Sequence, residues 1–462
     1  MMSSNLLISK IKEWANTQDN FLLCFLLLLS IDMVILKPVV ILLGIIYLNK
    51  QLAIKNRLGM PWFYVLIAAL ECVRFACLNN DYSKAHTVSF LIGISFWLMA
   101  ALAFLIIRTI VYQSNNKKIN NTLIAFFYIN VAFSIFNLIS VMIKSHSWNP
   151  FLSEDLNYGN STGDYIKGVF MAPCFINMFV NTFFAFYFIQ QKKYKNMLVA
   201  CAVACFTSCN FANIIFIPFL IFAFLKNNDK QLRKYIIYAL LVFVGFYALL
   251  SNGNLGYIYQ SAFNSNQSIN WQSINHNSKE DSALMHVNLG FKYGKLQSFQ
   301  ETIDYATAKP KQLLIGAGIG NFSSQLALRT SDVSGLQKSR LFKYLPTYIA
   351  PDFRDNHYKI FKLLYSLPGG FHSVKHQPNS TANQLLGEYG LIGVLLFFVF
   401  YVFYFLRHYQ KMQASLYMLL MLGAYMLFDY LFEYLSVVVF FELFFILECK
   451  LQSTQPAEIK TV

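Results

Sequence analysis

The residues best suited to chemistry lie in a stretch that leads into an apolar block, HQPNSTANQLLGEYGLIGVLLFF at 376–398. Pro378 and the polar residues after it form a helix-start signal. His376 stands just ahead of that start, where unpaired backbone N–H groups and the positive end of the helix dipole attract an anion. An imidazole beside an anion site is suited to act as a general base or proton shuttle. The alternative is that His376 only hydrogen-bonds a loop carbonyl.

Two segments upstream have local order of their own. Residues 294–308, GKLQSFQETIDYATA, have the spacing of an amphipathic helix, which Pro310 closes. Residues 313–322, LLIGAGIGNF, hold three glycines that allow tight turns, but no Walker lysine follows, so nucleotide binding is not predicted. We expect the helix to pack on an apolar surface through one face: Leu296, Phe299, Ile303 and Ala306.

No metal site and no cofactor is predicted. His372 and His376 are four residues apart, as in part of a zinc site. However, Gly369-Gly370 and Pro378 flank them, and no third ligand is spaced to join them.

Ionisable residues also lie within or at the ends of apolar blocks, where an unpaired charge is costly. Glu71 and Arg74 are three apart on one helix and are expected to pair, although Arg74 is also a candidate phosphate contact. Asp429 and Glu433 are candidates to line an acceptor cleft or to orient a loop arginine. The full set is Asp32, Glu71, Arg74, Asp429, Glu433 and Glu442.

The elements that must position these residues are membrane helices. Of the 462 residues, 56% are hydrophobic and 13% are charged, whereas soluble domains have about 45 to 50% and about 25%. The composition excludes a soluble globular enzyme, and the net charge of +15 does not by itself imply nucleic acid. Apolar blocks predict an all-α polytopic membrane protein with about twelve spans: 20–36, 38–49, 59–78, 88–107, 122–143, 167–189, 197–209, 210–225, 236–251, 389–407, 414–430 and 432–448.

Some edges of these spans are soft. The first two spans share one apolar run that is broken at Lys37-Pro38, and spans 7 and 8 share another that is broken near Asn210. A re-entrant hairpin at either place would change the topology, so the count ranges from ten to thirteen.

The basic residues set the orientation. With a cytoplasmic N-terminus, the cytoplasmic segments hold 19 Lys and Arg, and the short external loops hold four. The positive-inside rule then places both termini in the cytoplasm, with an amphipathic anchor at 1–19 and a tail at 449–462. It leaves spans at 20–251 and 389–448 and one large external segment, 252–388, with five of the eight histidines.

All eight cysteines fall in or beside apolar blocks, so the aqueous parts have no disulfide scaffold. Cys201, Cys205 and Cys209 recur every four residues, a spacing that we interpret as a stripe of small residues for helix packing.

Taken together, the spans, the late external loop, the stretch P-x-x-L-L-I-G-A-G-I-G-N-F and the closing N-x-x-x-N-Q-L-L-G-E-Y-G-L-I-G resemble the O-antigen ligase and O-antigen polymerase superfamily. The likeness is strongest over 290–400. It implies a metal-independent, inverting glycosyltransferase at the outer face of a bacterial inner membrane. The donor would be a glycan on undecaprenyl diphosphate. The acceptor would be a lipid A core sugar in a ligase or the next lipid-linked repeat unit in a polymerase.

The resemblance also implies site residues. In the family, loop arginines hold the diphosphate, and a histidine before the tenth or eleventh span helps to activate the acceptor. Here the usual His-Asn pair reads Asn379-Ser380, so His376 is the nearest substitute and His372 the second. The expected basic residue before the amphipathic helix is Lys295. The other candidate contacts of the diphosphate are Arg329, Arg340, Arg354 and, within a span, Arg74.

Three other classes remain open, and one of them is a purely structural or receptor role. A transporter or flippase for lipid-linked oligosaccharide would need paired halves and charges at mid-membrane, and we find no internal repeat. Another class of lipid-linked-sugar glycosyltransferase places acidic catalytic residues in its first external loop, which is almost absent at 36–38. Ligase and polymerase are not distinguished, although the long loop and the altered His-Asn pair slightly favour a polymerase.

Overall fold

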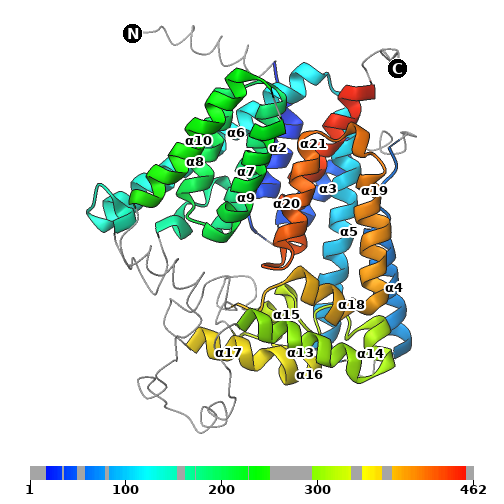
Figure 1. Cartoon of the computed structure of the whole chain (residues 1–462). Coiled ribbons are helices and arrows are strands. Elements are labelled where there is room, and N and C mark those ends of the chain that lie inside the picture. Colours follow the sequence, from blue (N-terminus) through cyan, green and yellow to red (C-terminus); the bar gives the residue numbers. More distant parts are fainter. Residues whose placement is uncertain are drawn as a thin grey trace.

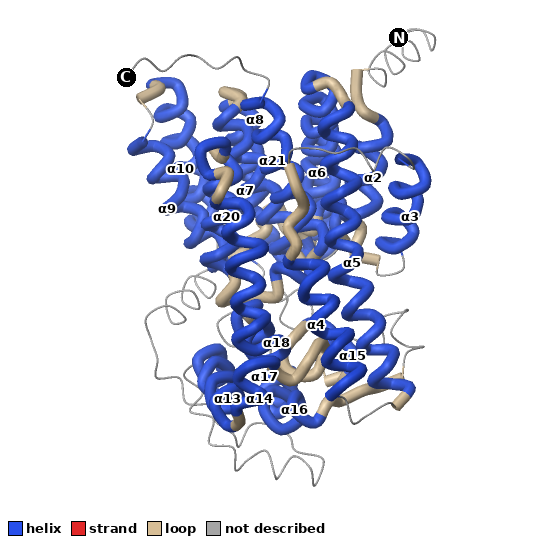
Figure 2. Tube along the Cα trace, turned by 90° about the vertical axis from the view of Figure 1, so that its right-hand side faces the viewer, coloured by secondary structure: helices blue, strands red, loops and turns tan. Residues whose placement is uncertain are grey.

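The computed structural model describes residues 17–33, 36–48, 58–78, 83–152, 162–171, 173–226, 228–249, 294–333, 346–366 and 377–453. Within these ranges every regular element is helical (Figures 1 and 2). The longer helices of the first part are α2 Asn20–Ser30, α3 Leu36–Leu48, α4 Phe63–Leu78, α5 Lys84–Gln113, α6 Asn116–Ser145, α7 Cys174–Gln190, α8 Tyr194–Phe206, α9 Asn210–Lys226 and α10 Lys230–Leu249.

In the second part of the chain, a group of mostly short helices at 294–366 precedes a group of mostly longer helices at 381–453. The long ones are α18 Thr381–Phe397, which continues through a π-helical turn at Phe398–Val402 into α19 Phe403–Leu406, then α20 Ala414–Tyr425 and α21 Leu435–Ser453. The short ones are α13 Gly294–Ala308, α14 Pro310–Ile315, α15 Gln325–Thr330, α16 Pro351–Phe353 and α17 Lys359–Ser366.

The helices follow the predicted apolar blocks, since each of the twelve blocks overlaps one of these long helices. Four stretches of the described chain are long and apolar enough to cross a membrane: α5, α6, α10 and the run from α18 to α19. The other helices in the blocks are shorter or less apolar. The all-helical class is therefore confirmed, and the number of crossings stays a prediction.

Helix α21 forms the centre of the bundle. Every residue from Leu435 to Lys450 is buried, and the helix packs against α5, α7 and α20. A helix with apolar residues on every side is stable only when other helices surround it. One carboxylate oxygen of its Glu442 has an internal partner, because Tyr64 donates a hydrogen bond to it at 2.6 Å.

Helix α5 joins the two ends of the molecule. Near its C-terminal end, Lys450 donates to the carbonyl of Val111 at 2.8 Å, and Ser114 hydrogen-bonds Asp19. At its N-terminal end, the ring of His86 stacks on Tyr348 with centroids 5.0 Å apart. Asp19 and Lys450, which are close to the two ends of the described chain, therefore lie at the opposite end of α5 from the short helices α13–α17 (Figure 1).

The first two helices separate at a different place from the predicted one. Helix α2 ends at Ser30 and α3 begins at Leu36, so Lys37 and Pro38 lie in the first turn of α3 rather than at the break. Proline is tolerated there because the first N–H groups of a helix have no intrahelical partner.

The predicted sixth span also begins differently. Residues 162–170 form two short 3₁₀ turns, and α7 starts only at Cys174. Asparagines of α6 and α7 satisfy the irregular backbone: Asn130 accepts from the N–H of Val169 at 3.1 Å, and Asn177 donates to the carbonyl of Ile166 at 3.0 Å. Irregular backbone buried among helices requires such partners.

Helix α13 has the predicted bounds but buries another face. Leu296 is 58% exposed and Ile303 is 49% exposed, so the predicted apolar face was wrong in those two residues. The buried side is largely polar, with Lys295, Ser298 and Thr302. Position in the tertiary structure overrode the hydrophobic pattern because these polar groups have partners in neighbouring elements. After α13, Pro310 does not simply close the helix but opens α14.

Candidate functional site

Three charged residues meet where the bundle contacts the short helices. The Asp32 carboxylate lies between two cations: one oxygen is 2.7 Å from Nζ of Lys37, and the other is 3.7 Å from the Arg329 guanidinium. The side chains of Asp32 and Arg329 are partly open, with exposed fractions of 14% and 23%, whereas that of Lys37 is buried, with 8% exposed. Two cations share one carboxylate here, and Arg329 also interacts electrostatically with Glu433.

Asp32 is held by the connection between α2 and α3. Its N–H donates to the carbonyl of Phe170 at 3.0 Å, which ties this connection to the irregular turn that the asparagines support. Lys37 comes from the first turn of α3. The carboxylate is therefore anchored by its backbone and paired through its side chain.

Arg329 is presented by the last turn of α15. The helix is capped by Ser324, which accepts from the N–H of Ala327 at 3.0 Å. Its first residue, Gln325, is bound by the two residues just before α21: its N–H donates to Glu433 at 2.6 Å, and its side chain donates to the Tyr434 hydroxyl at 2.8 Å. Glu433 therefore fixes the helix that carries a loop arginine, in line with one of the two roles expected for it.

The glycine-rich stretch fastens the short helices to the bundle. Gly316, Gly318 and Gly320 all have positive φ angles, which favour glycine. The N–H of Ala317 donates to the carbonyl of Gly387 at 2.8 Å, and that of Gly318 to Glu388 at 2.7 Å. The sequence pattern predicted tight turns and close backbone approach, and both are present.

Arg74 also helps to hold the glycine-rich stretch against the bundle. It pairs with Glu71 at 3.0 Å, as predicted, and donates to the carbonyl of Ala317 at 2.5 Å. Glu71 also accepts from the N–H of Ile319 at 2.9 Å. Because its guanidinium holds the loop, Arg74 has a structural role here, and its role as a diphosphate contact stays a prediction.

Lys295 is similarly engaged. Its ammonium donates to the carbonyls of Asn379 and Phe428, and the residue is only 7% exposed. Burial lowers the pKa of Lys295, while the carboxylate of Asp429 opposes that shift. The lysine that was predicted to stabilise a diphosphate is thus a cross-link between the starts of α13 and α18 in this structure.

The start of α18 differs from the predicted anion site. The helix begins at Thr381 with Ser380 as its cap, close to the predicted position. Its first N–H groups are already used, however: Thr381 donates to the carbonyl of Asp429 at 3.1 Å, and Ala382 to that of Met426 at 3.4 Å. The prediction of unpaired N–H groups at this helix start was wrong because the turn before η12 (Leu431–Glu433) covers them.

Other predicted site residues are placed differently or not at all. His372, His376 and Arg340 lie outside the described residues. Asn379 is partly exposed, and its side chain donates to Gln377 at 3.3 Å. Arg354 lies at the surface, 60% exposed, and pairs with its neighbour Asp355.

One loop histidine is described, and it belongs to the core. His357 is fully buried, lies 4.6 Å from the Phe322 ring and makes a 3.2 Å hydrogen bond with Thr302. Burial lowers its pKa to about 3, against a smaller opposing effect of the Ser298 carbonyl. It therefore stays neutral near pH 7. Within the described ranges, no group of three His, Cys, Asp or Glu residues is arranged to hold a metal.

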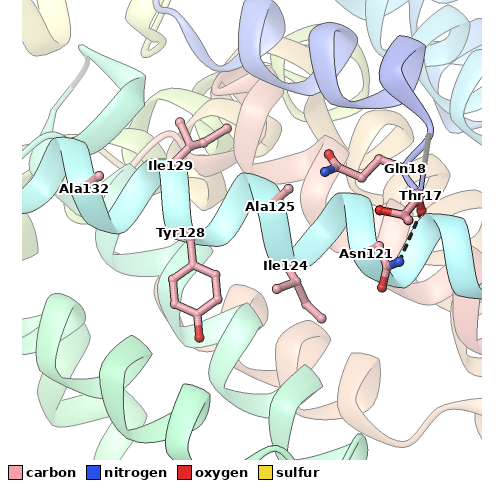
Figure 3. A pocket seen from close by; sticks show the side chains of 8 residues that line it. All are labelled: Thr17, Gln18, Asn121, Ile124, Ala125, Tyr128, Ile129 and Ala132. Atoms are coloured by element: carbon pink, nitrogen blue, oxygen red, sulfur yellow. Dashed lines mark hydrogen bonds between the residues drawn. The ribbon is translucent and has the colours of Figure 1, made fainter. Parts of the chain in front are cut away.

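A groove of about 520 Å³ lies elsewhere, along one face of α6 (Figure 3). Its polar residues are Thr17, Gln18 and Asn121, with Asn121 donating to the carbonyl of Thr17 at 3.2 Å. The groove lies toward the Asp19 end of the bundle, away from the Arg329 cluster. None of its lining residues is charged.

The residues that the sequence interpretation left out of the site are Asp32 and Lys37. The available signal was a carboxylate inside an apolar run, followed five residues later by a lysine. Its link to Arg329 had no signal, since the two positions are far apart in sequence. Comparisons of the chain with protein-family models, with curated proteins and with solved structures each gave no match. Fold and site together define an all-helical protein with apolar helices suited to a membrane and a partly open cationic cluster.

Proposed function

We propose that this chain is a glycosyltransferase of the O-antigen ligase or polymerase type. It would transfer or polymerise a glycan from an undecaprenyl-diphosphate donor at the outer face of a bacterial inner membrane, with a slight preference for polymerase. The observation that carries the proposal is the convergence of Lys37 and Arg329 on Asp32. Two cations at a partly open junction are suited to a diphosphate, which bears more negative charge than the carboxylate between them.

The chemistry fits these groups. Undecaprenyl diphosphate is a good leaving group when the charge that develops on it is neutralised, and Lys37 and Arg329 would supply that stabilisation without a metal ion. Asp32 would hold the two cations near one another before the donor binds. The general base belongs to the segment before α18, with His376 as the first candidate and His372 and Asn379 as the others.

The arrangement of the bundle supports the proposed topology. Asp19 and Lys450 lie at one end of α5, and the helices α13–α17 lie at the other. With both termini in the cytoplasm, as the distribution of basic residues predicts, the Arg329 cluster faces outward. The lipid-linked donor would then reach it from the outer leaflet, and the acceptor would be a glycan or lipid A core.

Deletion of the gene, followed by electrophoresis of the surface polysaccharide, tests the class. One repeat unit on the core indicates a polymerase, and lipid-linked polymer with none on the core indicates a ligase. If no lipid-linked repeat reaches the outer face, the protein is a transporter or flippase instead, and the proposal fails.

Point variants test the site. Complementation with Arg329→Ala should fail, with a loss of transfer of about a hundredfold or more, as for removal of one electrostatic donor. The matched control is Arg354→Ala, an exposed arginine of the same external segment, which should restore wild-type polysaccharide. Equal activity of both variants, at equal membrane levels, would contradict the site.

A further inference from the structure

Two cysteines from different elements bring their sulfur atoms together. Cys174 is the first residue of α7, and Cys209 lies in the turn between α8 and α9. Their Sγ atoms are 3.1 Å apart. A disulfide needs about 2.05 Å, so the two sulfurs need to approach by only about 1 Å more.

The surroundings separate this pair from the other cysteines of the same region. Cys205 and Cys201 lie on α8 with no exposed surface. Cys209 was predicted to continue their stripe, but α8 ends at Phe206 and the chain turns. Cys209 thereby leaves the helix face and meets Cys174, which corrects the packing interpretation for this one residue.

The two cysteines of the pair also differ in their access to solvent. Cys209 is partly exposed, whereas Cys174 is buried and its Sγ lies 3.4 Å from a carboxylate oxygen of Asp164. Ser208, next to Cys209, has a φ of +52° in a non-helical turn. A reagent therefore reaches Cys209 first, and the turn, rather than a packed helix, carries the sulfur that must move.

The pair lies at the same end of the bundle as the Arg329 cluster. Phe175, the neighbour of Cys174, packs edge-on against Tyr434 with ring centroids 4.9 Å apart. Tyr434 in turn accepts the hydrogen bond from Gln325 of α15. This step rests on the proposed function. In the orientation proposed there, this end of the bundle faces the oxidising side of the membrane, where disulfides persist.

We infer that Cys174 and Cys209 form a disulfide that fastens the start of α7 to the turn between α8 and α9. The oxidant is the disulfide of a thiol oxidase. The Cys209 thiolate attacks one sulfur of the oxidant's disulfide, which forms a mixed disulfide and releases the oxidant's other sulfur as a thiol. The Cys174 sulfur then attacks Sγ of Cys209 and displaces the oxidant's remaining sulfur. The chain loses two thiol hydrogens, and the oxidant leaves as a dithiol.

Thiol counting tests the inference. Membranes from aerobically grown cells are denatured and treated with a maleimide of high mass, with and without prior reduction. Two of the eight cysteines should react only after reduction. In Cys174→Ser or Cys209→Ser, every remaining cysteine should react without reduction. The matched controls Cys201→Ser and Cys205→Ser should keep the protected pair.

Peptide mass analysis of the wild-type protein gives a second measurement that needs no variant. A cross-linked pair of peptides containing Cys174 and Cys209, lighter by two hydrogens than their sum, supports the inference. Reaction of all eight cysteines without reduction would overturn it. Both assays read thiols directly, so loss of the disulfide is distinguishable from failure of the glycosyltransferase assignment, which is read from the polysaccharide.

Discussion

The guanidinium of Arg329 lies 3.7 Å from the carboxylate of Asp32, whose other oxygen binds Lys37. This contact joins the short helix α15 to the connection between α2 and α3. It makes a partly open ion cluster out of residues that the chain order keeps far apart. The cluster is also the place where the bundle, the irregular turn at 168–170 and the start of α21 come together.

A double-mutant cycle measures this contact. With Asp32→Asn, Arg329→Gln and the double variant, we expect a coupling of about 1 kcal/mol in the free energy of unfolding in detergent, because the partners are only partly exposed. The pair Arg354 and Asp355 is closer, at 2.9 Å, but more than half exposed, and serves as the control. A coupling at Asp32 no larger than at that surface pair would contradict the assigned contact.

The glycine-rich loop predicts a strong contrast between two alanine substitutions. Gly318 has a φ of +97°, and a Cβ there would lie 1.3 Å from the Arg74 guanidinium. Gly318→Ala should therefore destabilise the fold by about 1 to 3 kcal/mol. Gly245, inside α10, has no neighbour within 4 Å of its Cβ position. Gly245→Ala should be stabilising by up to about 1 kcal/mol. Thermal unfolding of the two variants measures this contrast. Similar melting temperatures would contradict the contact between the glycine-rich loop and Arg74.

Helix α20 is capped by a carboxylate from another helix. Glu448 of α21 accepts from the N–H groups of Gln413, Ala414 and Ser415 at 3.1, 2.7 and 3.2 Å. Glu448→Ala leaves buried donors without an acceptor and should cost about 1 to 3 kcal/mol. Glu448→Gln keeps one acceptor oxygen and should cost less. Unfolding midpoints that fall in the opposite order would refute the cap.

His357 predicts a pH dependence of stability. Its pKa is about 3 in the folded chain, lowered by burial from an ordinary value of 6.5. Between these values the unfolded chain binds a proton that the folded chain does not, so stability rises with pH across this window. The contribution of the neutral His357 to stability is lost as the pH falls from about 6.5 toward 3.

The comparison to make is between pH 8 and pH 5. The melting temperature of the wild type should fall by more between these values than that of His357→Gln, because the variant has no imidazole to protonate. The exposed His146 gives the matched control, and His146→Gln should follow the wild type. Parallel curves for the wild type and His357→Gln would exclude this contribution.

The sequence by itself determined the helical class, because apolar blocks of about twenty residues leave few alternatives in a bilayer. It also located α13, the start of α18 and the pairing of Glu71 with Arg74, since each depends on caps or spacing within one segment. The glycine pattern indicated close backbone approach for the same local reason.

Only the tertiary structure decided which polar groups are open and which are used. Hydrophobic pattern placed Leu296 on the buried face of α13, yet contacts with α18 and the turn after α20 bury Lys295 instead. The start of α18 has its N–H groups covered by that same turn. The cluster of Asp32 with Arg329 depends on how separate helices dock, because docking joins positions that no periodicity along the chain relates.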